Sequence, residues 1–323
     1  MEEAILNFHK QFAWEPVVVN AGGLKRHRRF VVGGMGGSSL ATGLLVNWMP
    51  EINVIVHRDY GLPVLSDAKE RLYIASSYSG NTEETIDFAK SALKKGYKVA
   101  TISIGGKLLK FAEKNNLPHI IIPDTKIQPR SALGFSMLAI AKLIGAEHVL
   151  RELHRLSTIL KPEALCAAGK KLSRILFGKV PIICASTRNR GVAYNWKIKM
   201  NETGKIPAFY NVFPELNHNE MTGFDTIEAT KKLSHGFHFV FLTDSVDHPK
   251  VQRRMAVCKK LYEDRGLSVT EVPFKGDTTL ERIFSSLLIA DWTALYLSNV
   301  YGTEAEQVPM VEQFKKLITV TGN

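Results

Sequence analysis

The feature of this sequence that most constrains its fold is an alternation between short apolar runs and longer segments with helical periodicity. Apolar strands that alternate with helices are typical of a parallel sheet covered on both faces. Five strands within about 95 residues predict a complete flavodoxin-like layer. The strands are expected at residues 30–32, 52–56, 72–75, 99–102 and 120–122, with helices near residues 4–14, 38–49, 82–95 and 107–115.

The same alternation restarts after a helical region from about residue 130 to 177. A chain of 323 residues also exceeds the usual size of one domain. We therefore predict an α/β protein with two flavodoxin-like domains, at residues 1–155 and 156–323, each a parallel sheet flanked by helices. The second domain is expected to have strands at residues 180–185, 237–242 and 267–272, helices near residues 194–201, from 248 and over 279–299, and a short C-terminal helix near 310–318.

Composition and charge argue against several classes of function. No run approaches the roughly 18 uninterrupted apolar residues of a membrane span, and the start Met1-Glu2-Glu3 lacks a basic, apolar leader. The three cysteines are far apart, which predicts neither disulfides nor a zinc site. The net charge is +11, and the only dense run of basic residues is at 25–29. The sequence lacks the aromatic residues, interleaved with basic ones, that are typical of nucleic-acid binders. We expect a cytoplasmic protein with no metal, cofactor, nucleic-acid or membrane partner.

A glycine-rich turn follows the first predicted strand and reads Gly33-Gly34-Met35-Gly36-Gly37-Ser38-Ser39. Glycine lets a ligand approach the backbone, and a helix N-terminus offers free N–H groups to an anion. The turn lacks the lysine of a P-loop and the full glycine spacing of a dinucleotide-binding fingerprint. The alternative, that these glycines only close a tight turn, stays open.

A hydroxyl-rich turn follows the third predicted strand and reads Ser76-Ser77-Tyr78-Ser79-Gly80-Asn81-Thr82. Ser77, Ser79 and Thr82 can direct three hydroxyls at one anion while the turn donates backbone N–H groups. Helix capping would explain any one of these residues, but it explains all three together poorly. The turn therefore predicts a phosphate site without a cationic side chain.

The two turns together resemble the sugar isomerase (SIS) domain, whose hydroxyl-rich loop holds the phosphate of phosphosugars. Three further segments narrow the resemblance to the bifunctional phosphoglucose/phosphomannose isomerases, from about Gly33 to the C-terminus. They are Pro129-Arg130-Ser131-Ala132-Leu133-Gly134, Asn201-Glu202, and Pro207 to Glu220, which reads PAFYNVFPELNHNE.

The resemblance implies a two-domain SIS architecture and a cofactor-free reaction. The expected reaction converts glucose 6-phosphate, and also mannose 6-phosphate, to fructose 6-phosphate through an enediolate. The resemblance further implies a homodimer with the site near the subunit interface. The implied substrate-binding residues are Gly36, Gly37, Ser38, Ser77, Ser79 and Thr82.

The resemblance also assigns catalytic roles. Glu202 would move the proton between C2 and C1, and His218 would open the sugar ring, because histidine exchanges protons near neutral pH. Arg130, always cationic, would stabilise the enediolate. Lys315, in the pattern Val311-x-x-Phe314-Lys315, would contact the ring-oxygen side, with Lys316 as the neighbouring alternative. Each of these residues also has an ordinary structural interpretation, as a cap, a loop residue or a surface charge.

The sequence departs from the family pattern at two places. Ser39 stands where a glycine is expected, which adds a Cβ near the proposed ligand. Val308, beside Gln307, stands seven residues before Lys315, where glucose-specific members carry Gln and dual-specificity members Thr. Valine keeps the β-branched shape of threonine, so we expect activity on both epimers.

Three rival interpretations remain. A phosphosugar-sensing SIS module would keep the hydroxyl loop but would not need Arg130, Glu202 and His218 together. A dinucleotide-dependent oxidoreductase would explain the glycine turn but not the hydroxyl turn. Another phosphosugar reaction on the same scaffold, such as glucosamine phosphate chemistry, is the nearest enzymatic alternative.

Overall fold

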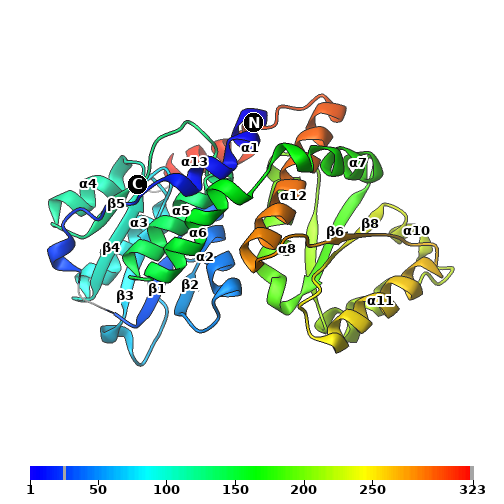
Figure 1. Cartoon of the computed structure of the whole chain (residues 1–323), viewed down its shortest axis with the longest axis horizontal. Coiled ribbons are helices and arrows are strands. Elements are labelled where there is room, and N and C mark those ends of the chain that lie inside the picture. The colour runs from blue at the N-terminus through cyan, green and yellow to red at the C-terminus, as the bar shows by residue number, and fades with distance from the viewer. Residues whose placement is uncertain (25–26, 321–323) are drawn as a thin grey trace. The chain divides into compact units, whose positions relative to one another are not determined.

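The computed structural model describes residues 1–24 and 27–320, and the chain divides into two compact units (Figure 1). The N-terminal unit consists of Glu3–Glu163 and Lys275–Ser285. The C-terminal unit consists of Met1–Glu2, Ala164–Phe274 and the chain from Ser286 onward. Each unit contains one parallel sheet, so the predicted fold class is confirmed.

The sheet of the N-terminal unit has the strand order β2-β1-β3-β4-β5, and all its strands are parallel. Each strand begins and ends within one residue of the range predicted from the sequence. Helices cover both faces of this sheet, so side chains on both sides of each strand are apolar. The strands therefore appear in the sequence as unbroken apolar runs. The strands are β1 (Arg29–Gly33), β2 (Asn53–His57), β3 (Leu72–Ser76), β4 (Lys98–Ser103) and β5 (His119–Ile121).

Helices cover both faces of this sheet. α3 (Glu83–Lys94) and α4 (Gly106–Lys114) pack on one face, where the rings of Phe88 and Tyr73 lie 5.7 Å apart. α2 (Gly36–Trp48) and α5 (Leu133–Leu143) contact each other, and α6 (Glu147–Ile159) packs against α5.

The helix predicted over residues 4–14 is wrong in detail. The structure has a short α1 (Glu2–Leu6) followed by a 3-10 helix, η1 (Phe8–Ala13). Asn7 adopts φ −90° and ψ 4°, outside the α-helical region, so one continuous helix is interrupted there. Phe12 is fully buried, and its ring lies 5.0 Å from that of Phe284.

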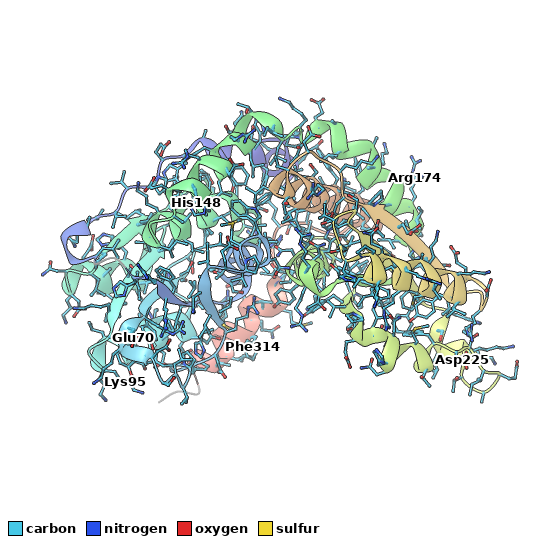
Figure 2. All side chains as sticks on the ribbon, turned by 60° about the horizontal axis from the view of Figure 1, so that its bottom comes forward. Glu70, Lys95, His148, Arg174, Asp225 and Phe314 are labelled. Atoms are coloured by element: carbon cyan, nitrogen blue, oxygen red, sulfur yellow. The ribbon has the colours of Figure 1, made fainter. Side chains whose placement is uncertain are left out.

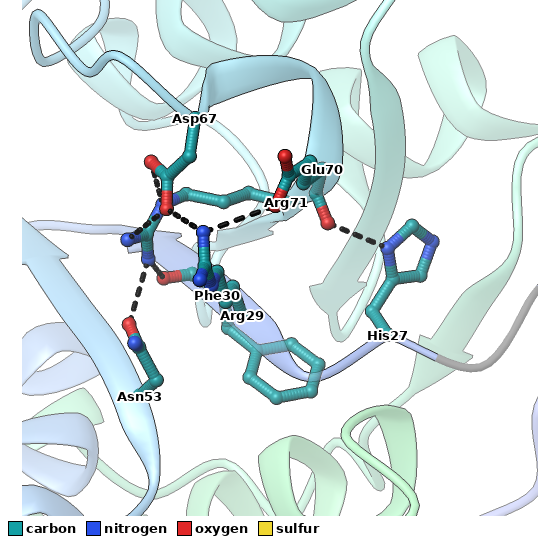
Figure 3. Close-up of polar contacts among 7 residues, drawn as sticks. All are labelled: His27, Arg29, Phe30, Asn53, Asp67, Glu70 and Arg71. Atoms are coloured by element: carbon teal, nitrogen blue, oxygen red, sulfur yellow. Dashed lines mark hydrogen bonds and ion pairs between the residues drawn. The ribbon is translucent and has the colours of Figure 1, made fainter.

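A buried arginine joins the amino ends of three neighbouring strands (Figure 3). Two nitrogens of Arg71 donate to the carboxylate of Asp67, both at 2.8 Å. A third donates to the Phe30 carbonyl at 3.2 Å and to the Asn53 side chain at 3.0 Å. Because a bidentate arginine–carboxylate pair has fixed geometry, this cluster fixes the amino edge of the sheet.

The sheet of the C-terminal unit has the strand order β7-β6-β8-β9, again entirely parallel. The sequence pattern did not predict β7 (Phe209–Phe213). The run Phe-Tyr-Asn-Val-Phe is interrupted by Asn211 and flanked by Pro207 and Pro214, which favour a loop. The other strands, β6 (Val180–Ser186), β8 (Phe237–Thr243) and β9 (Ser268–Pro273), agree with the prediction.

The helices of this unit again cover both faces of the sheet. α8 (Arg190–Glu202) packs on β6 and β7. α11 (Pro249–Glu263) packs on the other face, where Tyr262 contacts Phe239. The other helices of this unit are α7 (Cys166–Leu176), α9 (Glu220–Gly223), α10 (Lys231–Ser234), α13 (Pro309–Val320) and the 3-10 helices η6 (Thr187–Asn189) and η7 (Glu215–His218). α12 (Thr279–Tyr301) and η5 (Glu163–Leu165) have residues in both units. The N-terminal unit also has the 3-10 helices η2 (Ala21–Gly23), η3 (Ala68–Glu70) and η4 (Pro129–Ser131).

α12 is the single described helix whose length and apolar character would allow it to cross a membrane. Within its most apolar 18 residues, 78% of the window is buried inside the protein. Trp292 of this helix lies so close to α7 that a Cβ on Gly169 would be 2.3 Å from the Trp292 Cβ. α12 is thus packed as a core helix.

Candidate active site

The two predicted turns meet at the carboxyl edge of the first sheet. β1 and β3 are neighbours, so the turns that follow them lie side by side. The backbone N–H of Tyr78 donates to the Ser38 hydroxyl oxygen at 2.8 Å. A Cβ on Gly34 would lie 2.6 Å from the Ser76 carbonyl oxygen, so this position requires glycine. The two turns therefore pack directly against each other.

The segment around Arg130 packs directly on the glycine turn. A Cβ on Gly37 would lie 2.5 Å from the carbonyl carbon of Pro129 and 2.8 Å from the Arg130 nitrogen, so only glycine fits. η4 thereby rests on the first turn of α2, with the Arg130 side chain almost fully buried. The N-terminal unit thus brings Gly36, Gly37 and Ser38 next to Arg130.

Gln11 supports this arrangement, and sequence reasoning missed it. Its side-chain nitrogen donates to the Ser131 carbonyl at 2.7 Å, and its side-chain oxygen accepts from the Gly134 N–H at 3.0 Å. Gln11 is 4% exposed. No motif marks this residue, because its partners are more than a hundred positions away in the sequence.

The hydroxyl loop divides its residues between two tasks. The buried Ser77 hydroxyl lies 2.8 Å from the Thr82 hydroxyl and accepts from the Gly80 N–H at 3.1 Å. Ser79 is exposed, and Thr82 precedes the first residue of α3. Gly80 has φ +69°, and a Cβ there would lie 1.8 Å from the Gly105 carbonyl oxygen. Ser77 therefore shapes the loop, while Ser79 at its tip is exposed.

The unexpected Ser39 is accommodated by hydrogen bonds. It is 1% exposed, and its hydroxyl donates to the Gly36 carbonyl at 3.0 Å. Its oxygen accepts from the Nε of Arg58, also at 3.0 Å. The departure from glycine thus leaves no unsatisfied hydroxyl in the turn.

The corresponding edge of the second sheet has the opposite chemistry. The turn after β8 contains Asp244 and Asp247, both buried, and the Ser186 hydroxyl donates to Asp247 at 2.8 Å. Burial raises the pKa of Asp247, and the nearby Asp244 raises it further. These two acidic side chains distinguish this turn from the hydroxyl-rich turn of the first sheet. Over the described residues, no group of three or more His, Cys, Asp or Glu could hold a metal ion.

Glu202 lies toward the amino ends of the strands of the second sheet, and His218 lies at their carboxyl ends. Glu202 is the last residue of α8, and His218 is exposed at the end of η7, beyond β7. Thr187, at the turn into α8, donates to the Phe213 carbonyl at 2.9 Å, so β7 ends where α8 begins. The 13 residues of α8 span about 20 Å. The unit therefore does not bring Glu202 and His218 together.

Lys315 lies on the exposed helix α13, where its ammonium pairs with the Glu312 carboxylate at 2.8 Å. Lys316 beside it is exposed as well. Val308 lies just before α13, and its carbonyl accepts from the Glu312 N–H at 3.1 Å. The helix also exposes apolar side chains, including Phe314 at 59% (Figure 2), Met310 and Leu317.

The chain is similar in sequence to known sugar phosphate isomerases. Residues 167–318 match the family model described as the bacterial phospho-glucose isomerase C-terminal SIS domain. A bifunctional phosphoglucose/phosphomannose isomerase of Caldicellulosiruptor bescii is 36% identical over 304 residues, which cover 89% of this chain and 88% of that protein. Another, from Aquifex aeolicus, is 30% identical over 325 residues, 98% of each chain.

The fold is similar to that of solved phosphosugar enzymes. The crystal structure of tagatose-6-phosphate ketose/aldose isomerase from Escherichia coli matches with a TM-score of 0.70 at 15% identity, over 94% of this chain and 93% of that one. At that identity the similarity shows the fold alone. Together with the relatives above, it confirms the resemblance that the sequence motifs carried, and the chain belongs to the bifunctional phosphoglucose/phosphomannose isomerase family of SIS proteins.

Proposed function

We propose that this protein is a cytoplasmic, cofactor-free isomerase that converts glucose 6-phosphate and mannose 6-phosphate to fructose 6-phosphate. The observation that carries the proposal is that the turn with Ser38 contacts both the hydroxyl loop and the segment of Arg130 at the carboxyl edge of the first sheet. Family membership supports the same reaction.

The phosphate is proposed to bind the hydroxyl loop. Ser79 and Thr82 would donate their hydroxyls, and the backbone N–H groups at the start of α3 would add their partial positive charge. Ser77 would act mainly by holding Thr82 in place. The first turn of α2, with Gly36, Gly37 and Ser38, would bound the other side of the sugar phosphate.

The proposed chemistry is a proton transfer between neighbouring carbons. Glu202 removes the C2 proton of the open-chain aldose, and the C1 oxygen gains negative charge as the enediolate forms. The same carboxylic acid then returns the proton to C1, while the proton of the C2 hydroxyl moves to the C1 oxygen. Arg130, permanently cationic, stabilises the enediolate without competing as an acid.

His218 and Lys315 are proposed to act on the sugar ring before this transfer. His218 would take and return the proton that ring opening requires, and Lys315 would contact the ring-oxygen side. Lys316 remains the alternative lysine, because both are exposed on α13.

The separation of Glu202 from His218 supports a homodimer. Both groups must reach one hexose, yet they lie at opposite edges of the same sheet, about the length of α8 apart. We therefore propose that a second copy of the chain supplies His218 to the site that contains Glu202, near the subunit interface. The exposed apolar side chains of α13 are a surface that such an association can bury.

A coupled assay with the purified protein tests the proposed function. Glucose 6-phosphate and mannose 6-phosphate should each yield fructose 6-phosphate, and the reverse reaction should yield both aldoses. Binding of these sugars without turnover would favour a sensing module instead. Turnover of glucosamine 6-phosphate alone would favour the alternative chemistry on the same scaffold.

A further inference from the structure

The turn after α8 holds a lysine in an unusual backbone conformation. Lys205 has φ +57°, in the left-handed region that glycine occupies far more readily. The preceding Gly204 serves a different purpose, since a Cβ there would lie 2.8 Å from the Met200 carbonyl oxygen. A lysine kept in this conformation beside a glycine indicates that its side chain has a task.

The Lys205 ammonium connects two distant segments of the C-terminal unit. It donates to the Glu202 carbonyl oxygen at 2.7 Å and to the Gln307 carbonyl oxygen. The first contact places a cation at the carboxyl end of α8, where the helix dipole is negative. The second reaches the link between α12 and α13, 102 residues further along the chain. One side chain therefore joins the end of α8 to that link.

The link itself is ordered by contacts of its own. The Glu304 carboxylate accepts from the backbone N–H groups of Glu306, at 2.7 Å, and Gln307. The Met1 ammonium pairs with the Glu306 carboxylate. The link thus keeps its internal shape, and Lys205 sets its position relative to α8.

We infer that Lys205 is a positioning residue that fixes the proposed base Glu202 relative to residues 307–308. The inference rests on the proposed function, in which Glu202 is the base, and on the family resemblance, which assigns epimer choice to the position of Val308, beside Gln307. Lys205 lies outside the proposed phosphate loop, so its loss should change turnover and epimer preference rather than substrate binding. Misplacing a base by about 1 Å is enough to reduce a rate substantially.

Lys205→Met tests the inference, because methionine keeps an unbranched stem and removes the ammonium. The expected result is a fall in kcat of about tenfold or more, with KM within about twofold, for both sugars. The ratio of glucose to mannose turnover should change as well. Lys205→Arg, which keeps a cation, should have a kcat and an epimer ratio between those of Lys205→Met and the wild type. Lys179 and Lys205 line one surface cavity of the C-terminal unit, and the Lys179 ammonium also donates to a backbone carbonyl, that of His235, at 3.0 Å. Lys179→Met is therefore the matched control. The control should retain wild-type kcat and epimer ratio.

Hydrogen–deuterium exchange separates this inference from the proposed function. In Lys205→Met, amide exchange should rise at both residues 200–204 and residues 304–309, and Lys179→Met should leave both segments unchanged. Wild-type kcat and epimer ratio in Lys205→Met, with active wild-type enzyme, would overturn the inference. An inactive wild-type protein would contradict the proposed function instead, and unchanged exchange at either segment would still overturn the role of Lys205.

Discussion

The Ser38 hydroxyl oxygen accepts a 2.8 Å hydrogen bond from the backbone N–H of Tyr78. This bond links the turn after β1 to the turn after β3, at the edge where β1 and β3 are neighbours. Parallel strands bring their carboxyl ends to one edge of the sheet, so two turns that are separated in sequence lie in contact. The proposed phosphate site depends on this link.

Removing the outward hydroxyls of the loop should weaken phosphate binding. The double variant Ser79→Ala/Thr82→Ala is expected to raise KM for glucose 6-phosphate by at least about tenfold, because each hydrogen bond to a charged group is worth roughly 1.5 to 3 kcal/mol. Steady-state kinetics measure the change. Ser91→Ala, near the other end of α3, is the control. An unchanged KM in the double variant would place the phosphate elsewhere.

Two inactive variants should complement each other. If each site combines Glu202 of one copy with His218 of the other, a dimer of one Glu202→Gln chain and one His218→Ala chain contains one intact site. Random exchange of equal amounts should then recover about one quarter of wild-type activity, since half of the dimers are mixed. Activity no greater than the sum of the separate variants would contradict a shared site.

Activity should survive removal of metal ions. The proposed proton transfer uses only Glu202, with positive charge from Arg130, and no step involves a metal. Dialysis against EDTA should therefore leave kcat for glucose 6-phosphate unchanged. Loss of turnover that a divalent metal restores would reject this chemistry.

Stability should decrease in mild acid because of a buried histidine. Burial, with a contribution from the nearby Lys179, lowers the pKa of His238 to about 4, and its ring lies 2.8 Å from the Thr270 hydroxyl. The unfolded chain binds this proton near pH 6.5, so the stabilisation is complete above that pH and is lost as the pH falls toward 4. The free energy of unfolding should fall by at most about 1.4 kcal/mol per pH unit in this window.

His238→Gln should flatten the pH dependence between about 6.5 and 4. Urea unfolding at several pH values measures the slope. His148→Gln provides the matched control, because His148 is exposed on α6 (Figure 2). The assignment fails if the two variants keep the same slope as the wild type.

The sequence was most informative where a local pattern carries the structure. Apolar runs predicted the five strands of the first sheet, and the glycine and hydroxyl motifs marked the turns at the ends of two of them, because both signals depend on neighbouring residues. β7 was missed since Asn211 and the flanking prolines hide a strand that exists only through pairing with β6. A strand is therefore predicted well from local sequence when its own residues form an apolar run, and poorly when its pairing with a neighbouring strand stabilises it.

Residues that act across the chain left no local signal. Gln11 supports η4 from more than a hundred positions away, and Lys205 reaches Gln307 over a similar distance. The separation of Glu202 from His218 follows from the direction of α8 along β7, which motifs do not encode. Family resemblance named these two residues, and the topology adds that one unit does not bring them together.

The most direct test of Glu202 as the base uses glucose 6-phosphate that carries deuterium at C2. The wild-type protein should place part of the label at C1 of fructose 6-phosphate and release part to solvent, because one carboxylate carries the proton between the carbons. Glu202→Gln keeps the size of the side chain and removes its basicity, so kcat and label transfer should fall together by about 10² to 10⁴, with little change in KM. Wild-type loss of the C2 deuterium in Glu202→Gln would show that another residue is the base and would contradict the central claim.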